Sequence, residues 1–191
     1  MSLRVEQDGR LCRIALACPE KRNALDPAAC ARLLEELKSA AADENIGAIL
    51  LEADGPVFCS GLEESRELLA IGRHISKPIV AAVQGVALGG GLALAANAHV
   101  VVAAQGTSFG LIGIREGKWD EAAYRALANA IGERRALELA LTGRVFATNE
   151  ALAWGLIHYV APVFELDDRA VEIAMGLAKT SPGAVRQALS R

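Results

Sequence analysis

The stretch that decides the fold is KPIVAAVQGVALGGGLALAANAHVVVAAQGTSFG, residues 77–110. Two runs of β-branched residues flank a triple glycine and an alanine-rich segment, an order that predicts a strand, a glycine turn, a buried helix and a second strand. Glycines at the start of a helix leave its first N–H groups uncovered, because they have no Cβ. These groups lie at the positive end of the helix dipole, where a phosphate, a carboxylate or a developing oxyanion is favoured.

Three functions compete for this segment. A membrane span is suggested by the absence of acidic and basic residues over 78–114, but Asn97 would lie near the middle of such a span. A dinucleotide-binding turn needs a third small residue after Gly89 and Gly91, and Leu94 stands there instead. An oxyanion hole at a glycine-rich helix start fits best, and a tight packing turn between strand and helix is the structural alternative.

The composition argues against several classes of protein. With 191 residues, 52% of them hydrophobic, the chain is long enough for one domain with a core. A net charge of −3 argues against nucleic acid as a partner, because neutralising phosphates requires a basic face. The four cysteines form no CxxC pair, which is typical of reduced cytosolic thiols, and residues 1–8 lack the apolar segment of a signal peptide. We therefore expect a cytoplasmic protein without a membrane span, and without a metal site because no ligand spacing relates His74, His99 and His158.

Local signals predict an alternation of strands and helices. Asp8-Gly9 is a turn signal before an alternating segment, so a hairpin is expected to lead into a strand over 11–17. Asp26 followed by Pro27 marks the start of a helix. Further strands are expected over 46–51, 57–61 and 157–160, and further helices over 68–75, 120–130, 133–141, 149–154 and 164–179. This alternation predicts a single α/β domain with a largely parallel sheet.

Five blocks of this sequence, in this order, resemble the crotonase superfamily of enoyl-CoA hydratases and isomerases. The blocks are Lys21-Arg22-Asn23-Ala24-Leu25, Phe58-Cys59-Ser60-Gly61, residues 77–91, Phe109-Gly110, and Leu141-Thr142-Gly143 with Ala153-Trp154-Gly155-Leu156. The resemblance implies the ClpP/crotonase fold, a superhelix of ββα units with two roughly perpendicular sheets in one domain over 1–191. It also implies a homotrimer or hexamer. Compared with the family, the chain is short over 62–76 and at its C-terminus.

The resemblance also implies the ligand. An acyl-CoA thioester is expected, with coenzyme A as part of the substrate and no separate cofactor. By position, the backbone N–H groups of Leu62 and Gly90 would bind the thioester carbonyl and stabilise an enolate. Coenzyme A would lie along the first two blocks, at Lys21, Arg22, Ala24, Ser60 and Gly61. An exposed basic turn before a helix is the structural alternative for Lys21 and Arg22.

The chain departs from the family at two glutamates, which activate water and protonate the α-carbon in typical hydratases. Ala93 and Gly113 occupy their positions here, and neither can transfer a proton. Asp120 and Glu121 are candidate replacements, because some superfamily members with other reactions place a working residue there. The alternative is that both simply favour the first turn of a helix.

The predicted function is therefore an enoyl-CoA hydratase/isomerase-type enzyme with unconventional acid–base groups. Glu116 and Tyr124 are further candidates, with a solvated ion pair and a packed helix tyrosine as the respective alternatives. Two other functions stay open. One is a non-catalytic acyl-CoA binding subunit, and the other is a divergent acyl-CoA lyase such as a decarboxylase, which needs the oxyanion hole but not both glutamates.

Overall fold

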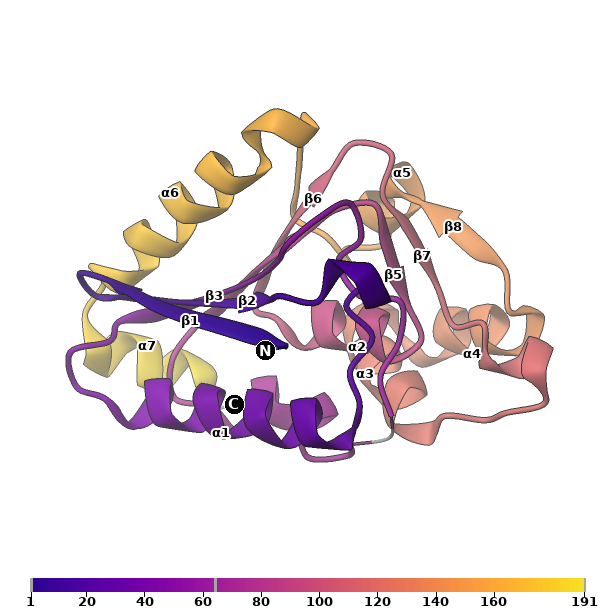
Figure 1. Ribbon diagram of the computed structural model, residues 1–191, viewed down its shortest axis with the longest axis horizontal. Helices are drawn as coiled ribbons and strands as arrows, with labels where there is room; N and C mark the ends of the chain where they lie inside the picture. Colours follow the sequence, from indigo (N-terminus) through magenta and orange to yellow (C-terminus); the bar gives the residue numbers. More distant parts are fainter. Residues whose placement is uncertain (1, 64, 191) are drawn as a thin grey trace.

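The computed structural model describes residues 2–63 and 65–190, which form two β-sheets surrounded by helices (Figure 1). The strands are β1 (Leu3–Asp8), β2 (Leu11–Leu16), β3 (Ala48–Ala53), β4 (Ile79–Val83), β5 (Val86–Leu88), β6 (Val100–Ala104), β7 (Ser108–Gly110), β8 (Val145–Ala147) and β9 (Tyr159–Ala161). The α-helices are α1 (Pro27–Ala42), α2 (Gly90–Asn97), α3 (Glu121–Ile131), α4 (Glu133–Thr142), α5 (Thr148–Ala153), α6 (Leu166–Ala178) and α7 (Pro182–Leu189).

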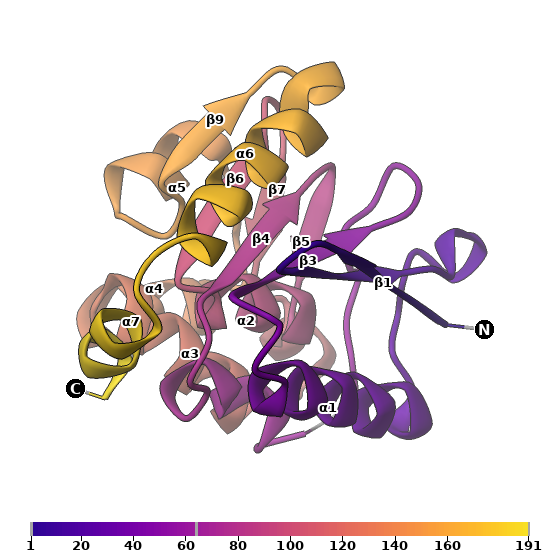
Figure 2. The ribbon, with the colours of Figure 1, turned by 90° about the vertical axis from the view of Figure 1, so that its left-hand side faces the viewer.

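The larger sheet has the order β1-β2-β3-β4-β6-β9. Its neighbours from β2 to β9 are parallel, and β1 pairs antiparallel with β2 through the turn at Asp8 and Leu11. The predicted hairpin and the predicted largely parallel sheet are both confirmed. A parallel sheet buries both of its faces, and here α1 lies on one side of the sheet and α6 on the other (Figure 2).

Alternation along the strands assigns side chains to the two faces. In β3, Leu50 packs in the cluster that contains α6, whereas its neighbours Ile49 and Leu51 belong to the larger cluster that contains α1. The buried positions of α6 are four residues apart, at Leu166, Ala170, Ala174 and Ala178. Three of these are alanines, so α6 can approach the sheet closely.

The start of α1 follows from its first two residues, as predicted. The Asp26 side chain accepts a hydrogen bond from the Ala29 N–H at 2.8 Å, and Pro27 occupies the first helical position. One free donor of the helix end is thereby satisfied, and proline costs no hydrogen bond there.

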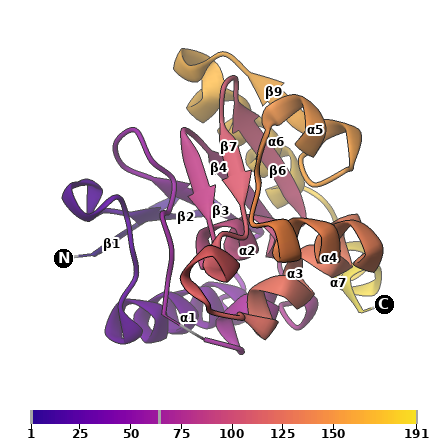
Figure 3. The same ribbon diagram turned by 90° about the vertical axis from the view of Figure 1, so that its right-hand side faces the viewer.

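The stretch 77–110 contains two strands more than predicted, the short strands β5 and β7. The chain turns between β4 and β5 at Gly85, which has φ 63°, and β5 joins the second sheet in the order β5-β7-β8 (Figure 1). Figure 3 shows β7 from the side of the molecule that carries α3, α4 and α5. A Cβ on Gly85 would lie 1.9 Å from the Pro56 carbonyl oxygen, so only glycine permits this turn. Within the described residues, no helix combines the length and the apolar character needed to cross a membrane.

Two other predicted elements differ from the structure. Residues 57–61 form no strand, and this segment contributes an isolated bridge between Cys59 and Ala87. Leu62, the next residue, forms another isolated bridge with Leu25. The helix predicted over 68–75 is a 3-10 helix over Leu68–Arg73. The irregular course of residues 57–62 matters, because it brings this segment onto the start of α2.

Candidate active site

Three glycines form the start of α2, and each has its own reason for lacking a side chain. Gly89 precedes the helix with φ 53° and ψ −122°, a conformation that favours glycine. A Cβ on Gly91 would lie 2.3 Å from the Cys59 carbonyl oxygen, and one on Gly90 would lie 2.2 Å from Cγ of Leu62. The segment that contains Cys59 and Leu62 therefore crosses directly over the helix start.

Two backbone donors at this crossing have no acceptor among residues 2–63 and 65–190. Leu25 donates its N–H to the Gly61 carbonyl at 3.1 Å and accepts from the Glu63 N–H at 3.0 Å, so the Leu62 N–H lies on the opposite side of this parallel bridge. The Gly90 N–H belongs to the first turn of α2, which offers it no intrahelical acceptor. Both donors are available to a ligand.

Leu62 and Gly90 border one cavity of about 230 Å³, which we call the Gly90 cavity. Its other side is formed by residues of the segment 111–124 together with Ala140. Several of its lining side chains are apolar, including Leu111 and Ile114. A hydrogen bond to a developing negative charge is stronger in such surroundings, because the dielectric is lower than in bulk water.

The two positions that hold glutamate in typical hydratases have different environments. Ala93 is fully buried inside α2 and is absent from the described lining of the Gly90 cavity. Gly113 borders the cavity, and a Cβ added there would meet its nearest atom, the Lys118 carbonyl oxygen, at 3.2 Å. Only the Gly113 position has direct access to the cavity.

Asp120 and Glu121 face different cavities. Asp120 borders the Gly90 cavity and caps α3, because its Oδ1 accepts from the Ala123 N–H at 2.9 Å. Glu121 borders a separate cavity of about 560 Å³, together with Arg125, which pairs with it at 2.7 Å. Trp119, which borders the Gly90 cavity, donates its Nε1–H to Glu121 at 2.8 Å. These contacts, the Trp119 hydrogen bond foremost, lower the pKa of Glu121. The helix-start interpretation holds for Asp120, whose Oδ2 accepts no hydrogen bond from the described residues.

Tyr124 also borders the Gly90 cavity and is buried. Its hydroxyl lies 3.5 Å from Glu133 Oε1, and its ring centroid is 5.1 Å from that of Trp119. Desolvation and the Glu133 carboxylate raise the pKa of Tyr124, so its hydroxyl stays protonated at neutral pH. Glu116 borders the cavity as well, but it is exposed and pairs with Lys118 at 3.1 Å.

The predicted coenzyme A residues lie in two adjoining turns. The Ser60 N–H donates to the Arg22 carbonyl at 3.1 Å, and both Ser60 and Gly61 border the Gly90 cavity. Lys21, Arg22 and Ala24 are exposed and lie outside the described lining of that cavity. A ligand that extends along the exposed turn would therefore reach the cavity past Ser60.

Asn23 holds these two turns together, a role that the sequence did not reveal. Its Nδ2 donates to the carbonyls of Asp54 at 2.9 Å and Val57 at 2.7 Å, and its Oδ1 accepts from the Cys18 N–H at 2.9 Å. The side chain is fully buried, and its φ of 52° lies in the left-handed region that asparagine tolerates. The one available signal was an asparagine in a turn between polar and apolar residues.

Comparison with known proteins identifies the family of this chain. The family model described as enoyl-CoA hydratase/isomerase matches residues 63–191. Enoyl-CoA hydratase domain-containing protein 3, a mitochondrial protein of Rattus norvegicus, is 32% identical over 198 residues, which cover 94% of this chain and 66% of that protein. The mevalonyl-coenzyme A hydratase of Aspergillus fumigatus is 33% identical over 191 residues, which cover 91% of this chain and 71% of that protein.

The crystal structure of an enoyl-CoA hydratase from Bacillus anthracis superposes on this fold with a TM-score of 0.92 at 28% identity, covering 99% of this chain and 81% of that chain. The chain spans just under two thirds of the length of the rat relative. The fold predicted from the five sequence blocks is confirmed by this superposition. Because the family model also matches more than half of its residues, the chain belongs to the enoyl-CoA hydratase/isomerase family of the crotonase superfamily.

Proposed function

We propose that this protein is an enoyl-CoA hydratase/isomerase-type enzyme that binds an acyl-CoA thioester and stabilises its enolate. The supporting observation is that the N–H groups of Leu62 and Gly90, which donate to no described residue, belong to residues that border one cavity. Such preorganised donors stabilise charge that develops only in the transition state. Loss of one oxyanion donor costs on the order of 3 kcal/mol in known enzymes.

In this proposal, Asp120 and Tyr124 replace the missing glutamate pair. Asp120 borders the cavity and keeps one oxygen free of described donors, and in this proposal it accepts a proton from water or from the α-carbon. Tyr124, held protonated, donates a hydrogen bond or a proton to the intermediate. Glu121 acts indirectly in this scheme, because it orients Trp119 beside the cavity.

The coenzyme A moiety extends along the turn that contains Lys21, Arg22 and Ala24 in this proposal. Exposed cations next to the cavity entrance suit its phosphates. A homotrimer or hexamer is part of the proposal, since symmetric association is the usual arrangement. The rat relative is mitochondrial by name, and a cytoplasmic location for this chain stays a prediction.

Exchange of the α-protons of butyryl-CoA for deuterium tests this proposal, because it reports enolate formation without requiring addition of water. We expect the unaltered chain to catalyse the exchange. Asp120→Asn should reduce it about 100-fold or more, the range expected for a general base, while asparagine still caps α3. Glu121→Gln is the matched control and should keep most of the activity, because Glu121 faces the other cavity.

Each other outcome has a definite meaning. Binding of butyryl-CoA without exchange would indicate a non-catalytic acyl-CoA binding subunit. Release of carbon dioxide from a malonyl-type thioester, without exchange of butyryl-CoA, would indicate the lyase. Equal losses in the two variants would remove Asp120 as the base, and failure to bind any coenzyme A ester would refute the proposal as a whole.

A further inference from the structure

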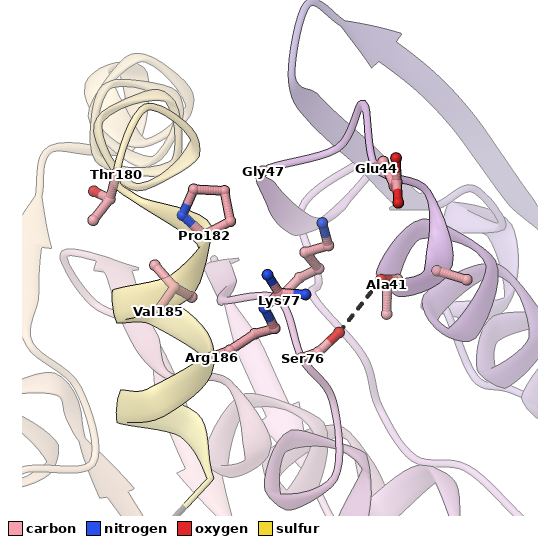
Figure 4. A pocket seen from close by; sticks show the side chains of 10 residues that line it. Ala41, Glu44, Gly47, Ser76, Lys77, Thr180, Pro182, Val185 and Arg186 are labelled. Carbon is pink, nitrogen blue, oxygen red and sulfur yellow. Dashed lines mark hydrogen bonds between the residues drawn. The ribbon is translucent and has the colours of Figure 1, made fainter.

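A second cavity of about 330 Å³ lies between the end of α1, the segments that lead into β3 and β4, and helix α7 (Figure 4). We call it the Lys77 cavity. None of its described lining residues borders the Gly90 cavity. It lies at the end of the larger sheet where β3 and β4 begin, so it is distinct from the candidate active site.

Two cationic side chains extend into the Lys77 cavity from different elements. Lys77 precedes β4 and Arg186 belongs to α7, and Figure 4 shows both side chains directed toward the space between the two segments. The Lys77 ammonium donates to the Ile46 carbonyl at 2.6 Å, a contact that holds the charge in place without neutralising it. The guanidinium group of Arg186 donates to no acceptor among residues 2–63 and 65–190.

One carboxylate, Glu44, borders the cavity within the described part of the chain. It forms no ion pair with Lys77 or Arg186 there, so the two positive charges face the same space without a counter-ion. The start of α7 at Pro182 borders the same space, and the helix dipole adds to its positive potential. Bringing like charges together is unfavourable unless an anion lies between them.

Helix α7 packs weakly against the domain, so an anion bound in the Lys77 cavity would affect how this helix is attached. No described residue of α7 is buried, so this helix contributes little apolar contact to the domain. An anion held by Arg186 on α7 and by Lys77 next to β4 would link the helix to the body of the domain through charge-assisted hydrogen bonds.

We propose that the Lys77 cavity binds a small anion of the phosphate class, and that the bound anion attaches α7 to the domain. A tetrahedral phosphate presents oxygens to donors on several sides at once, which suits cations approaching from two different elements. A single carboxylate presents its two oxygens in one plane and fits this arrangement less well. The site does not depend on the enzymatic function proposed above.

Titration of the 191-residue chain with inorganic phosphate tests this site, with chloride adjusted to hold the ionic strength constant. We expect saturable binding by calorimetry and slower amide hydrogen exchange in α7 when phosphate is bound. Arg186→Gln should weaken binding about tenfold, the effect of removing one charge-assisted hydrogen bond. Glu44→Gln should strengthen binding, because it removes the opposing charge.

Arg169→Gln is the matched control. Arg169 lies on α6, pairs with Glu172 and does not border the Lys77 cavity, so its replacement should leave the affinity unchanged. Equal weakening by Arg186→Gln and Arg169→Gln would mean attraction to the surface charge in general and would overturn the proposal. Absence of saturable binding, or binding that leaves α7 exchange unaffected, would overturn it as well.

Discussion

The side chain of Leu62 packs against the Cα of Gly90 so closely that a Cβ on Gly90 would lie 2.2 Å from Leu62 Cγ and 2.8 Å from Cδ1. This contact joins two segments that are 28 positions apart in the sequence, and each of the two residues offers one of the proposed oxyanion donors. The relative placement of the donors therefore depends on this packing contact together with the bridge between Cys59 and Ala87, where the Leu88 N–H donates to the Cys59 carbonyl at 3.1 Å.

Replacing Gly90 by alanine should force these segments apart. We expect a loss of about 1–3 kcal/mol in the free energy of unfolding, typical of overpacking, together with weaker acyl-CoA binding. Adding Leu62→Ala should recover stability, and urea unfolding would measure both. Gly176→Ala is the control, because Gly176 is exposed within α6 with no atom near its added Cβ, so stability should stay the same or rise by up to about 1 kcal/mol. Equal destabilisation at both glycines would contradict the packing argument.

Glutamate should be tolerated at position 113 and not at position 93. Gly113 borders the Gly90 cavity with only the Lys118 carbonyl close to an added Cβ, whereas Ala93 is fully buried. Ala93→Glu should cost several kcal/mol, since it buries an unpaired charge, and Gly113→Glu should cost about 1 kcal/mol. Hydration of crotonyl-CoA by the Gly113→Glu variant should exceed that of the parent. The reverse order of stabilities in urea would show that the two positions have been assigned to the wrong environments.

Removal of the Asn23 side chain should loosen the entrance to the cavity. Asn23→Ala leaves the carbonyls of Asp54 and Val57 and the N–H of Cys18 without their partner, and we expect about 3 kcal/mol or more of destabilisation. Affinity for coenzyme A esters, measured by calorimetry, should fall as well. Asn45→Ala, at an exposed position, should change stability by no more than about 0.5 kcal/mol. A comparable loss in the two variants would argue against a special role for Asn23.

Stability should fall as the pH is lowered below about 6.5, because two histidines are held neutral in the folded state. Partial desolvation lowers the pKa of His99 and of His158, and the Nδ1 of each accepts a backbone N–H, from Ile79 at 2.9 Å and from Val101 at 3.0 Å. Below the unfolded-state pKa, the unfolded chain binds protons that the native chain does not, so the free energy of unfolding decreases with falling pH.

Urea unfolding as a function of pH would measure this dependence. Each histidine contributes a slope of at most about 1.4 kcal/mol per pH unit. His99→Gln and His158→Gln should each reduce the slope of the parent, and His74→Gln, at an exposed position, is the matched control. An unchanged slope in both the His99 and the His158 variants would disprove the assignment.

Local chemistry was sufficient to predict most elements of the fold. The start of α1 follows from Asp26 and Pro27, and the first hairpin follows from Asp8-Gly9, because caps and turns involve residues that are near in sequence. The extra turn at Gly85 could not be predicted in this way. It exists because the backbone passes within contact of Pro56, almost 30 positions earlier.

The residues of the candidate site were likewise predictable only in part. The resemblance to the crotonase superfamily singled out Leu62, Gly90 and Gly113 by position, and all three border one cavity. The sequence could not choose between Asp120 and Glu121. Asp120 caps α3 and Glu121 is the first residue of that helix, so the docking of α3 decides which of them borders the cavity.

The amino-acid sequence by itself determined three features, because they are properties of the residue types. These are the glycine-rich helix start, its unprotected N–H groups and the lack of glutamates at positions 93 and 113. Other features depend on which distant segments come into contact. These are the Gly90 cavity, the burial of Ala93, the hydrogen bonds from Asn23 to two turns, and the placement of Lys77 and Arg186 at one cavity. Those contacts arise from packing of the whole chain, because the close fit of apolar side chains is a collective property that no short stretch specifies.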